Sequence, residues 1–351
     1  MGVFDAAEFD DHERVVFCRD PGAGLRAIIA VHSTVLGPAL GGCRMWPYGS
    51  EDAALTDALR LSQAMTYKHA LAGTGQGGGK AVIIGDAKTD KTPALMRAMG
   101  RAVDALGGRY IVAEDVGTSV EDMAVVREVT RHVAGVAEGG SGDPSPITAY
   151  GVLCGIKAAV SHKLGRGDLA GVSVAVQGLG NVGYALCALL HEAGASLHVA
   201  DIDGAAVARA VEAFGAATAE PETIHAAPVD VLAPCALGGV LNDRTIPAIV
   251  APIVAGAANN QLDEDGDGAA LAARGILYAP DYAINAGGII NIAFEGDYDR
   301  DLAMRRTEGI HDTLLEIFRR ADAEGVPTNQ VADRLAVERI EKARDAFTKD
   351  P

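Results

Sequence analysis

Several kinds of residue are scarce in this sequence, and each scarcity narrows what the protein can be. The 351 residues include one tryptophan, and aromatic residues make up only 5% of the chain. The five cysteines are odd in number, scattered and never in C-x-x-C spacing, which argues against a disulfide framework and favours reduced thiols in a cytoplasmic protein. No hydrophobic run approaches the roughly 20 residues that cross a bilayer, so we expect no membrane association.

Positive charge is also in short supply. Lys and Arg total 30 against 47 Asp and Glu, which gives a formal net charge of −17. A surface of this sign repels nucleic acids and anionic membranes, so neither is expected as a partner. Any anionic ligand must therefore be held locally, by a few cations or by backbone amides.

Glycine is abundant instead, and the overall pattern is that of an α/β protein. The chain holds 43 glycines and 49% hydrophobic residues, and its length makes two domains the first expectation. Apolar periodicity predicts the following elements: strands at 14–18, 25–32, 81–84, 110–113, 172–177 and 197–200, and helices at 51–71, 92–106, 147–162, 299–324 and 328–348. The stretch 139–146, G-G-S-G-D-P-S-P, breaks every periodicity and predicts a linker.

A glycine-rich stretch at 73–80, G-T-G-Q-G-G-G-K, resembles a nucleotide phosphate loop at first sight. The spacing does not fit, because the first glycine of such a loop would fall on Thr74 and its magnesium-binding hydroxyl on Ala81. A strand-like run follows, whereas a phosphate loop leads into a helix. We interpret the stretch as a flexible approach whose glycines remove side chains that would block Lys80. A solvated surface loop is the alternative.

A dinucleotide site is predicted in the second half of the chain. Gly178, Gly180 and Gly183 stand in G-x-G-x-x-G spacing between an apolar strand and a helix, and the next strand ends on Asp201. Such glycines let a pyrophosphate approach a helix N-terminus, and the acid accepts hydrogen bonds from a ribose. Carboxylates at 201 and 203 without a neighbouring arginine would repel a 2′-phosphate, so NAD is favoured over NADP. The alternative is a doubly wound domain that binds nothing.

Later strands should end at the same edge of the sheet, at 231–238, 253–260 and 284–288. Asn259 and Asn285 could there hold a carboxamide, or could cap loops. We therefore expect an α/β fold of two domains: a mixed α/β substrate domain at 1–145, completed by the C-terminal helix at about 321–351, and a Rossmann doubly wound NAD-binding domain at 146–320. No metal site is expected, and His69 is interpreted as a helix-surface residue.

Three residues of the first half could serve a hydride-transfer reaction. Such chemistry needs a fixed cation for a substrate carboxylate, a group that exchanges a proton near neutral pH, and a carboxylate that orients both. Lys68, Lys80 and Asp115 supply one of each. Burial beside a second ammonium would favour the neutral amine that a base requires.

In its sequence motifs the chain resembles a known family, the amino acid dehydrogenases of the glutamate, leucine, phenylalanine and valine group. The resemblance covers nearly the whole chain and rests on these motifs: G-P-A-L-G-G-C-R-M-W (37–46), M-T-Y-K-H-A-L-A-G (65–73), G-G-G-K-A (77–81), A-E-D-V-G-T (113–118), G-D-P-S-P-I-T-A (142–149), G-L-G-N-V-G (178–183), A-N-N-Q-L (258–262) and I-N-A-G-G (284–288). It implies reversible NAD-dependent oxidative deamination of an L-amino acid to a 2-oxo acid and ammonia, in a homo-oligomer.

The resemblance also implies residue roles. Lys80 would be the general acid and base, Asp115 would assist proton transfer, and Lys68 would bind the substrate carboxylate. The remaining implied residues are Gly41 and Gly42 at the substrate, and Thr148, Gly178, Gly180, Asn181, Val182, Gly183, Asp201, Ala236, Asn259 and Asn285 at the cofactor.

Substrate choice in the family maps onto four positions that are all apolar here: Leu40, Ala113, Ile289 and Ile292. Glutamate-specific members carry a lysine where this chain has Leu40, so an acidic side chain would be buried uncompensated. Phenylalanine-specific relatives leave the substrate pocket wider at the last two of these positions, whereas Ile289 and Ile292 make it narrower here. Branched aliphatic substrates such as leucine, isoleucine and valine therefore fit best, although Cys43 stands where leucine-specific relatives often have threonine. A phenylalanine dehydrogenase and a non-catalytic NAD-sensing protein are the alternatives.

Overall fold

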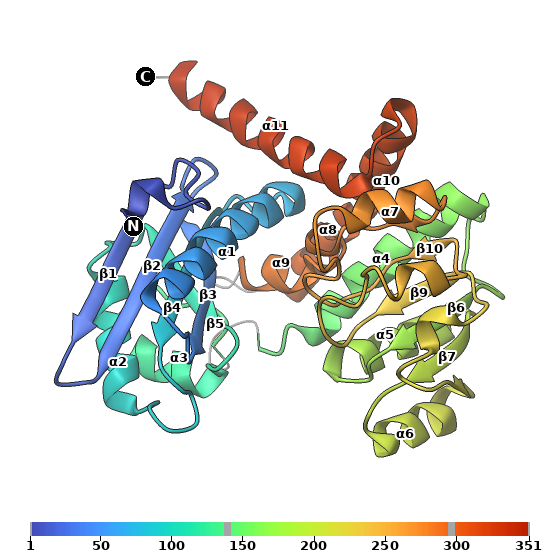
Figure 1. Cartoon of the computed structure of the whole chain (residues 1–351), viewed down its shortest axis with the longest axis horizontal. Coiled ribbons are helices and arrows are strands. Elements are labelled where there is room, and N and C mark those ends of the chain that lie inside the picture. The colour runs from blue at the N-terminus through green and yellow to red at the C-terminus, as the bar shows by residue number, and fades with distance from the viewer. Residues whose placement is uncertain (1, 137–141, 294–298, 350–351) are drawn as a thin grey trace. The chain divides into compact units, whose positions relative to one another are not determined.

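The computed structural model describes residues 2–136, 142–293 and 299–349 (Figure 1). Contacts within the chain divide it into two compact units. The first unit comprises Met1–Asp143, Ile292–Asp299 and Ala336–Pro351, and the second comprises Pro144–Asn291 and Arg300–Leu335. The chain thus enters the second unit twice, at Pro144 and at Arg300, and returns to the first twice.

The first unit is built on a mixed five-stranded sheet with the order β1-β2-β4-β3-β5. Its strands are β1 (Arg14–Asp20), β2 (Leu25–Ser33), β3 (Ala39–Trp46), β4 (Gly77–Ile84) and β5 (Tyr110–Glu114). Strands β1 and β2, predicted at 14–18 and 25–32, pair as an antiparallel hairpin, β2 is antiparallel to β4, and β3 runs parallel to both β4 and β5.

Helix α1 (Glu51–Ala72) confirms the helix predicted from Ser50 onward. The Ser50 hydroxyl accepts a hydrogen bond from the Ala53 amide at 3.1 Å, and Glu51 and Asp52 lie in the positively polarised first turn. The helix ends where Gly73 adopts a left-handed conformation with φ +62°. The other helices of this unit are η1 (Val3–Asp5), α2 (Pro93–Asp104) and α3 (Val120–Arg127).

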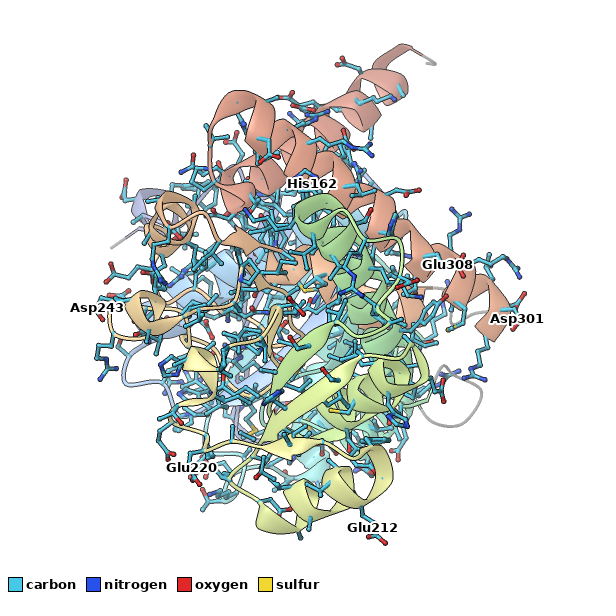
Figure 2. All side chains as sticks on the ribbon, turned by 90° about the vertical axis from the view of Figure 1, so that its right-hand side faces the viewer. His162, Glu212, Glu220, Asp243, Asp301 and Glu308 are labelled. Atoms are coloured by element: carbon cyan, nitrogen blue, oxygen red, sulfur yellow. The ribbon has the colours of Figure 1, made fainter. Side chains whose placement is uncertain are left out.

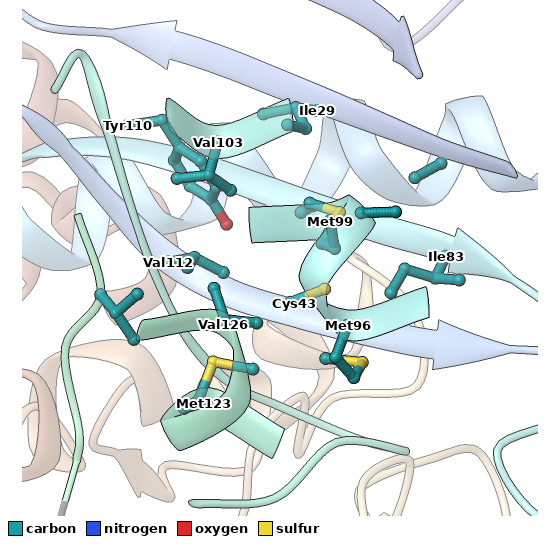
Figure 3. Packing of buried hydrophobic residues seen from close by; sticks show 14 of the residues in the cluster. Ile29, Cys43, Ile83, Met96, Met99, Val103, Tyr110, Val112, Met123 and Val126 are labelled. Carbon is teal, nitrogen blue, oxygen red and sulfur yellow. The ribbon is translucent and has the colours of Figure 1, made fainter. Parts of the chain in front are cut away.

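Hydrophobic side chains cover both faces of this sheet. On one face, Ala30 of β2 and Val82 of β4 pack with Leu59 of α1. On the other face, Met99 of α2 and the fully buried Tyr110 of β5 belong to a second cluster, shown in Figure 3. Side chains alternate along a strand, so Lys80 lies on the same face as Val82, toward α1.

The glycine run at 77–79 is not a flexible loop, and the prediction of a strand beginning at 81 was wrong. Strand β4 begins at Gly77, and all three glycines are buried in the middle of the sheet. A Cβ at Gly78 would lie 2.1 Å from the backbone nitrogen of Thr66 on α1, and one at Gly79 would lie 2.7 Å from the Tyr110 ring. The glycines are therefore required by close packing around β4 rather than by access to Lys80.

The second unit contains a six-stranded sheet with the order β11-β10-β9-β6-β7-β8, in which every pair is parallel. Its strands are β6 (Ser173–Gln177), β7 (Ser196–Ala200), β8 (Ala217–Thr218), β9 (Val231–Pro234), β10 (Ile253–Val254) and β11 (Leu277–Tyr278). Numbered from β6, this is the 3-2-1-4-5-6 order of a dinucleotide-binding doubly wound fold, with its switch point between β6 and β9. The Rossmann-type fold predicted for this half is confirmed.

The helices of the second unit are α4 (Ser145–Leu164), α5 (Asn181–Glu192), α6 (Gly204–Phe214), η2 (Ile224–Ala226), η3 (Ile246–Ala248), α7 (Asp267–Ala273), α8 (Asp281–Ile284), α9 (Gly287–Ala293) and α10 (Arg300–Glu324). Helix α9 crosses into the first unit at Ile292, and the last helix, α11 (Thr328–Lys349), does so at Ala336. Figure 2 shows His162 on α4 and Glu308 on α10, two helices that contact each other. In the part of the chain described, no helix is long and apolar enough to span a membrane.

In two places of this half, 284–288 and 139–146, the structure differs from the elements expected from the sequence. The residues at 284–288 do not follow a strand: Asn285 caps the end of helix α8, and the sixth strand, β11, comes earlier. Of the predicted linker 139–146, positions 139–141 lie outside the described residues, and α4 already begins at Ser145 with Pro146 in its first turn.

Candidate functional site

Lys80 and Asp115 form a close ion pair in the first unit. The Lys80 Nζ lies 2.6 Å from the Asp115 Oδ2, and only 7% of the lysine side chain and 22% of the aspartate side chain are exposed. Lys80 stands on the central strand β4, whereas Asp115 directly follows β5. Strand β3 lies between the two, so the pair bridges three parallel strands. A buried charge is tolerated only when it is paired in this way.

Glycine at position 42 makes room for this pair. Gly42 lies on β3 opposite Ala113 of β5, and a Cβ there would lie 2.6 Å from the Asp115 Cβ. Its neighbour Gly41 is equally constrained, because its Cβ would lie 1.8 Å from the Gly79 carbonyl oxygen. These glycines, predicted to line a substrate site, allow the backbone and Asp115 to approach one another.

Asp115 has a second cationic partner that the sequence reading missed. The Arg44 Nε lies 3.2 Å from Asp115 Oδ2, and its Nη1 lies 3.0 Å from Asp57 Oδ2 on α1. Burial would raise the pKa of Asp115, but the charges of Lys80 and Arg44 outweigh this effect and hold that pKa below its usual range. The signal available in the sequence was an arginine within an otherwise apolar strand, in G-G-C-R-M.

Lys68 and His69 are neighbours on α1 with different surroundings. Lys68 is half-buried, on the helix that packs over β4. His69 is fully buried, so its interpretation as a surface residue was wrong. Its Nε2 lies 3.2 Å from the Leu40 carbonyl oxygen and its Nδ1 lies 2.8 Å from the Thr74 hydroxyl. Burial lowers the pKa of His69 to about 3, so the ring is neutral and ties α1 to β3.

The predicted specificity residues are buried and apolar. Leu40 on β3 is 1% exposed and Ala113 on β5 is 5% exposed, and both belong to the first unit. Ile289 is 8% exposed and lies three residues before Ile292 on α9, which places both on one face of that helix. None of the four carries a charge that could pair with an acidic substrate side chain.

The three glycines of the second unit have different surroundings. Gly178 adopts φ +101°, and a Cβ there would lie 2.8 Å from Ala236. A Cβ at Gly183 would lie 2.0 Å from the Gly178 carbonyl oxygen. At Gly180, by contrast, no atom of the described residues other than its chain neighbours lies within 4 Å of the Cβ position. Packing explains the first and third glycines, and the middle one faces open space.

That open space lies at the N-terminus of α5. Gly180 is the N-cap of the helix, and it has no side chain that could cap the backbone amides that follow it, such as those of Asn181 and Val182. Uncapped amides at a helix N-terminus bind anions such as phosphate. The residues present therefore fit the pyrophosphate of a dinucleotide.

Asp201 lies directly after β7 and beside the glycine turn. Its Oδ2 accepts a hydrogen bond from the Leu179 amide at 2.6 Å, and its Oδ1 accepts one from the Asp203 amide at 2.8 Å. Two backbone donors thus fix the carboxylate at the end of the second strand of the fold. A carboxylate in this place accepts ribose hydroxyls in dinucleotide-binding folds.

The amide side chains predicted at the nicotinamide lie together. The Asn285 Nδ2 donates to the Asn259 Oδ1 at 2.7 Å and to the Ala257 carbonyl at 3.0 Å. Asn285 is 4% exposed, whereas Asn259 is exposed beyond the end of β10. Thr148 on α4 donates to the Pro144 carbonyl, and its hydroxyl oxygen would lie 2.9 Å from a Cβ at Gly288. The chain thus brings 148 and 288 together, and 259 and 285 together.

Neither cysteines nor metal ligands add a further centre among the residues described. All five cysteines are free thiols. Across 2–136, 142–293 and 299–349, no group of three or more His, Cys, Asp or Glu side chains is arranged to hold a metal ion.

The sequence of this chain matches two family models and several related enzymes along nearly its whole length. Residues 12–132 match the model of the Glu/Leu/Phe/Val dehydrogenase dimerisation domain, and residues 139–210 and 199–346 match that of Glutamate/Leucine/Phenylalanine/Valine dehydrogenase. Leucine dehydrogenase of Geobacillus stearothermophilus is 53% identical, over 100% of this chain and 97% of its own. Phenylalanine dehydrogenase of Bacillus thermotolerans is 48% identical, over 95% and 89%.

A solved structure agrees with these matches. The crystal structure of L-tryptophan dehydrogenase from Nostoc punctiforme superposes with a TM-score of 0.87 at 48% identity, covering 95% of this chain and 97% of the other. Both the fold and the sequence therefore align along nearly the whole chain.

Proposed function

This chain belongs to the Glu/Leu/Phe/Val dehydrogenase family of NAD(P)-dependent amino acid dehydrogenases, and we propose that it oxidatively deaminates branched-chain L-amino acids with NAD. The reversible reaction would yield a 2-oxo acid, ammonia and the reduced cofactor. The matched dimerisation domain indicates a homo-oligomer.

The buried Lys80–Asp115 pair is the observation that carries this proposal. Lys80 would take a proton from the water that attacks the substrate imine carbon, and would return it to the leaving amine. Asp115, 2.6 Å away, would hold the lysine amine in place. Lys68 on α1 would bind the substrate carboxylate. Bound NAD would supply the hydride acceptor.

Residues of the second unit would hold that cofactor. The α5 N-terminus at Gly180, Asn181, Val182 and Gly183 would bind the pyrophosphate, and Asp201 would accept hydrogen bonds from the ribose. Gly178 and Ala236 would form the floor of the turn. Thr148, Asn259 and Asn285 would contact the nicotinamide carboxamide. A carboxylate at 201 repels a 2′-phosphate, which supports NAD over NADP.

Substrate choice follows from the lack of charge at the specificity positions. Leu40, 1% exposed, offers no partner to an acidic side chain, and leaving a carboxylate unpaired there costs several kcal/mol. Ile289 and Ile292 would narrow the space for the substrate side chain, which favours leucine, isoleucine and valine. One methylene changes selectivity only about 10- to 200-fold, so all three are expected to react.

An aromatic amino acid is the second candidate. The phenylalanine and tryptophan dehydrogenases named above are nearly as similar to this chain as the leucine dehydrogenase is. The apolar positions 40 and 113 would accept an aromatic ring as readily as an aliphatic chain. The space that Ile289 and Ile292 leave for the substrate side chain would decide between an aromatic and a branched aliphatic amino acid.

A panel of L-amino acids, each with NAD and with NADP, tests the proposal. We expect reduction of NAD with leucine, isoleucine and valine, and kcat/KM values for phenylalanine and tryptophan that are at least about tenfold lower. A higher kcat/KM for phenylalanine or tryptophan would reject the branched-chain assignment. Absence of cofactor reduction with every amino acid would reject the reaction itself.

A further inference from the structure

The Lys80–Asp115 pair is one end of a longer row of charged and polar groups. Besides Lys80, Asp115 contacts Arg44, which contacts Asp57 of α1. The Tyr48 hydroxyl donates to the same Asp57 oxygen, Oδ2, at 2.5 Å. These contacts run from β4 through β3 to α1 without a break.

Asp115 receives both of its cations on one oxygen. Lys80 Nζ lies 2.6 Å and Arg44 Nε 3.2 Å from Oδ2. Since the two donors come from neighbouring strands, together they restrict the rotation of the carboxylate. The Thr118 hydroxyl accepts from the Asp115 amide at 3.0 Å and fixes the adjoining backbone. Asp115 is thus held by Arg44 and Thr118 in addition to Lys80.

Arg44 is itself held by its other partners. Its side chain is 22% exposed and that of Asp57 is 27% exposed, so the pair between them at 3.0 Å is partly shielded from solvent. A guanidinium makes two directed contacts at once, through Nε to Asp115 and through Nη1 to Asp57. A lysine at position 44 has a single donor group and cannot reproduce both directions.

We propose that Arg44 is a positioning residue of the dehydrogenase: it holds the Asp115 carboxylate in the orientation that Lys80 needs for proton transfer. Asp57 and Tyr48 orient Arg44 in turn. The inference deepens the proposed function, since it assumes that Lys80 and Asp115 perform the proton transfer. It assigns Arg44 no contact with substrate or cofactor.

A cavity beside Arg44 makes the proposal testable by chemical rescue. Arg44, Asp57 and Trp46 contribute to the lining of a cavity of about 620 Å³. Its rim is accessible, because Trp46 is 51% exposed and Val116 is 49% exposed. Guanidinium ion can therefore reach the space that truncation of Arg44 leaves.

The experiment compares Arg44→Ala and Arg44→Lys with the wild type and with Arg101→Ala. Arg101 also forms an arginine–aspartate pair in this unit, with Asp20 at 2.8 Å, but does not contact Asp115. Loss of a charged hydrogen bond predicts a fall in kcat of about 10- to 100-fold for Arg44→Ala, with a much smaller change in KM. Arg101→Ala should retain its kcat, and millimolar guanidinium should restore part of the kcat of Arg44→Ala alone.

The pH profile gives a second readout. Titratable groups that interact electrostatically with Asp115 are Lys80, Arg44, Cys43, Tyr48, Tyr110 and Glu114. Without Arg44 one cation is lost, so the acid limb of kcat/KM should move to higher pH. Arg44→Ala combined with Asp57→Ala should cost little more than Arg44→Ala alone, because both act through one path.

Two results would overturn the positioning role. One is a kcat of Arg44→Ala within about threefold of the wild type. The other is a loss of activity that matches a loss of folded protein in thermal unfolding and does not respond to guanidinium. If the wild type oxidises a different amino acid, the same comparison applies with that substrate. If it oxidises none, both the function and the role of Arg44 are rejected.

Discussion

His69 of α1 lies 3.2 Å from the backbone carbonyl oxygen of Leu40 on β3. The contact joins the helix that carries Lys68 to the strand that carries the predicted specificity residue. A neutral, buried ring performs this role, and the adjoining lysine is left on a different face of the helix. A structural contact and the proposed anchor of the substrate carboxylate thus fall on consecutive residues.

Lys80→Ala should lower kcat by about 10²- to 10⁴-fold, because the proton-transfer group is removed. Lys68→Ala should act mainly on the KM for the amino acid, because a carboxylate anchor is lost. Steady-state kinetics separates the two. Lys91→Ala is the matched control, since Lys91 also pairs with an aspartate, Asp122, at 2.7 Å, and it should keep most of its turnover. Near-normal kcat in Lys80→Ala would place the base elsewhere.

Gly180→Ala should mainly lower the affinity for NAD, whereas Gly183→Ala should mainly lower the stability of the fold. Beyond its chain neighbours, no described residue has an atom within 4 Å of a Cβ at 180, so the free energy of unfolding should change by less than about 1 kcal/mol while NAD affinity falls. Alanine at 183 would lie 2.0 Å from the Gly178 carbonyl and should destabilise the fold by about 1–3 kcal/mol. Thermal unfolding and NAD titration measure both. Undiminished NAD binding in a folded Gly180→Ala variant would remove the pyrophosphate from this turn.

Asp201→Ser should relax the preference for NAD over NADP by about tenfold or more, because the repulsion of a 2′-phosphate disappears. The ratio of kcat/KM for the two cofactors is the measurement. Asp168→Ser serves as the control, since serine can still accept the hydrogen bond that the Ala170 amide donates to Asp168 at 3.1 Å. An unchanged ratio in Asp201→Ser would show that another residue selects the cofactor.

Acid should destabilise the first unit through its buried histidines. Burial lowers the pKa of His32 to about 4 and that of His69 to about 3, below the value of 6.5 for an unfolded histidine. The unfolded chain therefore binds more protons below pH 6.5, and stability is full above that pH and is lost as pH falls toward 4.

The contribution of His32 can be isolated by substitution. His32→Asn should flatten this pH dependence by up to roughly 3 kcal/mol, because asparagine can still bond the Thr66 hydroxyl, 2.8 Å from the His32 ring, without titrating. His311→Asn is the control, because the His311 side chain is 37% exposed. Denaturant unfolding between pH 4 and pH 8 measures the slope, and identical slopes for wild type and His32→Asn would contradict the assignment.

Arg339→Ala should weaken the end of α1. The Arg339 Nη1 donates to the Leu71 carbonyl at 2.7 Å and to the Ala70 carbonyl at 3.3 Å, so α11 caps the helix that carries Lys68. We expect a loss of about 1–3 kcal/mol of stability and a raised KM for the amino acid. Arg334→Ala on α11, which removes a surface pair with Glu324 of α10, is the control. An unchanged KM would show that α11 does not position Lys68.

Much of this architecture was predictable because the signals are local. Ser50 and Gly73 delimit α1 through hydrogen bonds and backbone conformations within a few residues. The strand, glycine turn and helix around Gly178 and Gly180 are likewise contiguous in the chain. Where an element starts, turns and ends was therefore determined largely by the sequence itself.

The tertiary structure decided what the sequence left open. Gly77 begins a central strand, His69 is buried, Asn285 ends a helix, and Arg44 contacts Asp115. The first, second and fourth of these depend on atoms far apart in the chain: Thr66 against Gly78, Leu40 against His69, and Asp115 against Arg44. Burial and charge pairing arise only when distant segments pack, so a local pattern can name a reactive residue but cannot show which partners hold it.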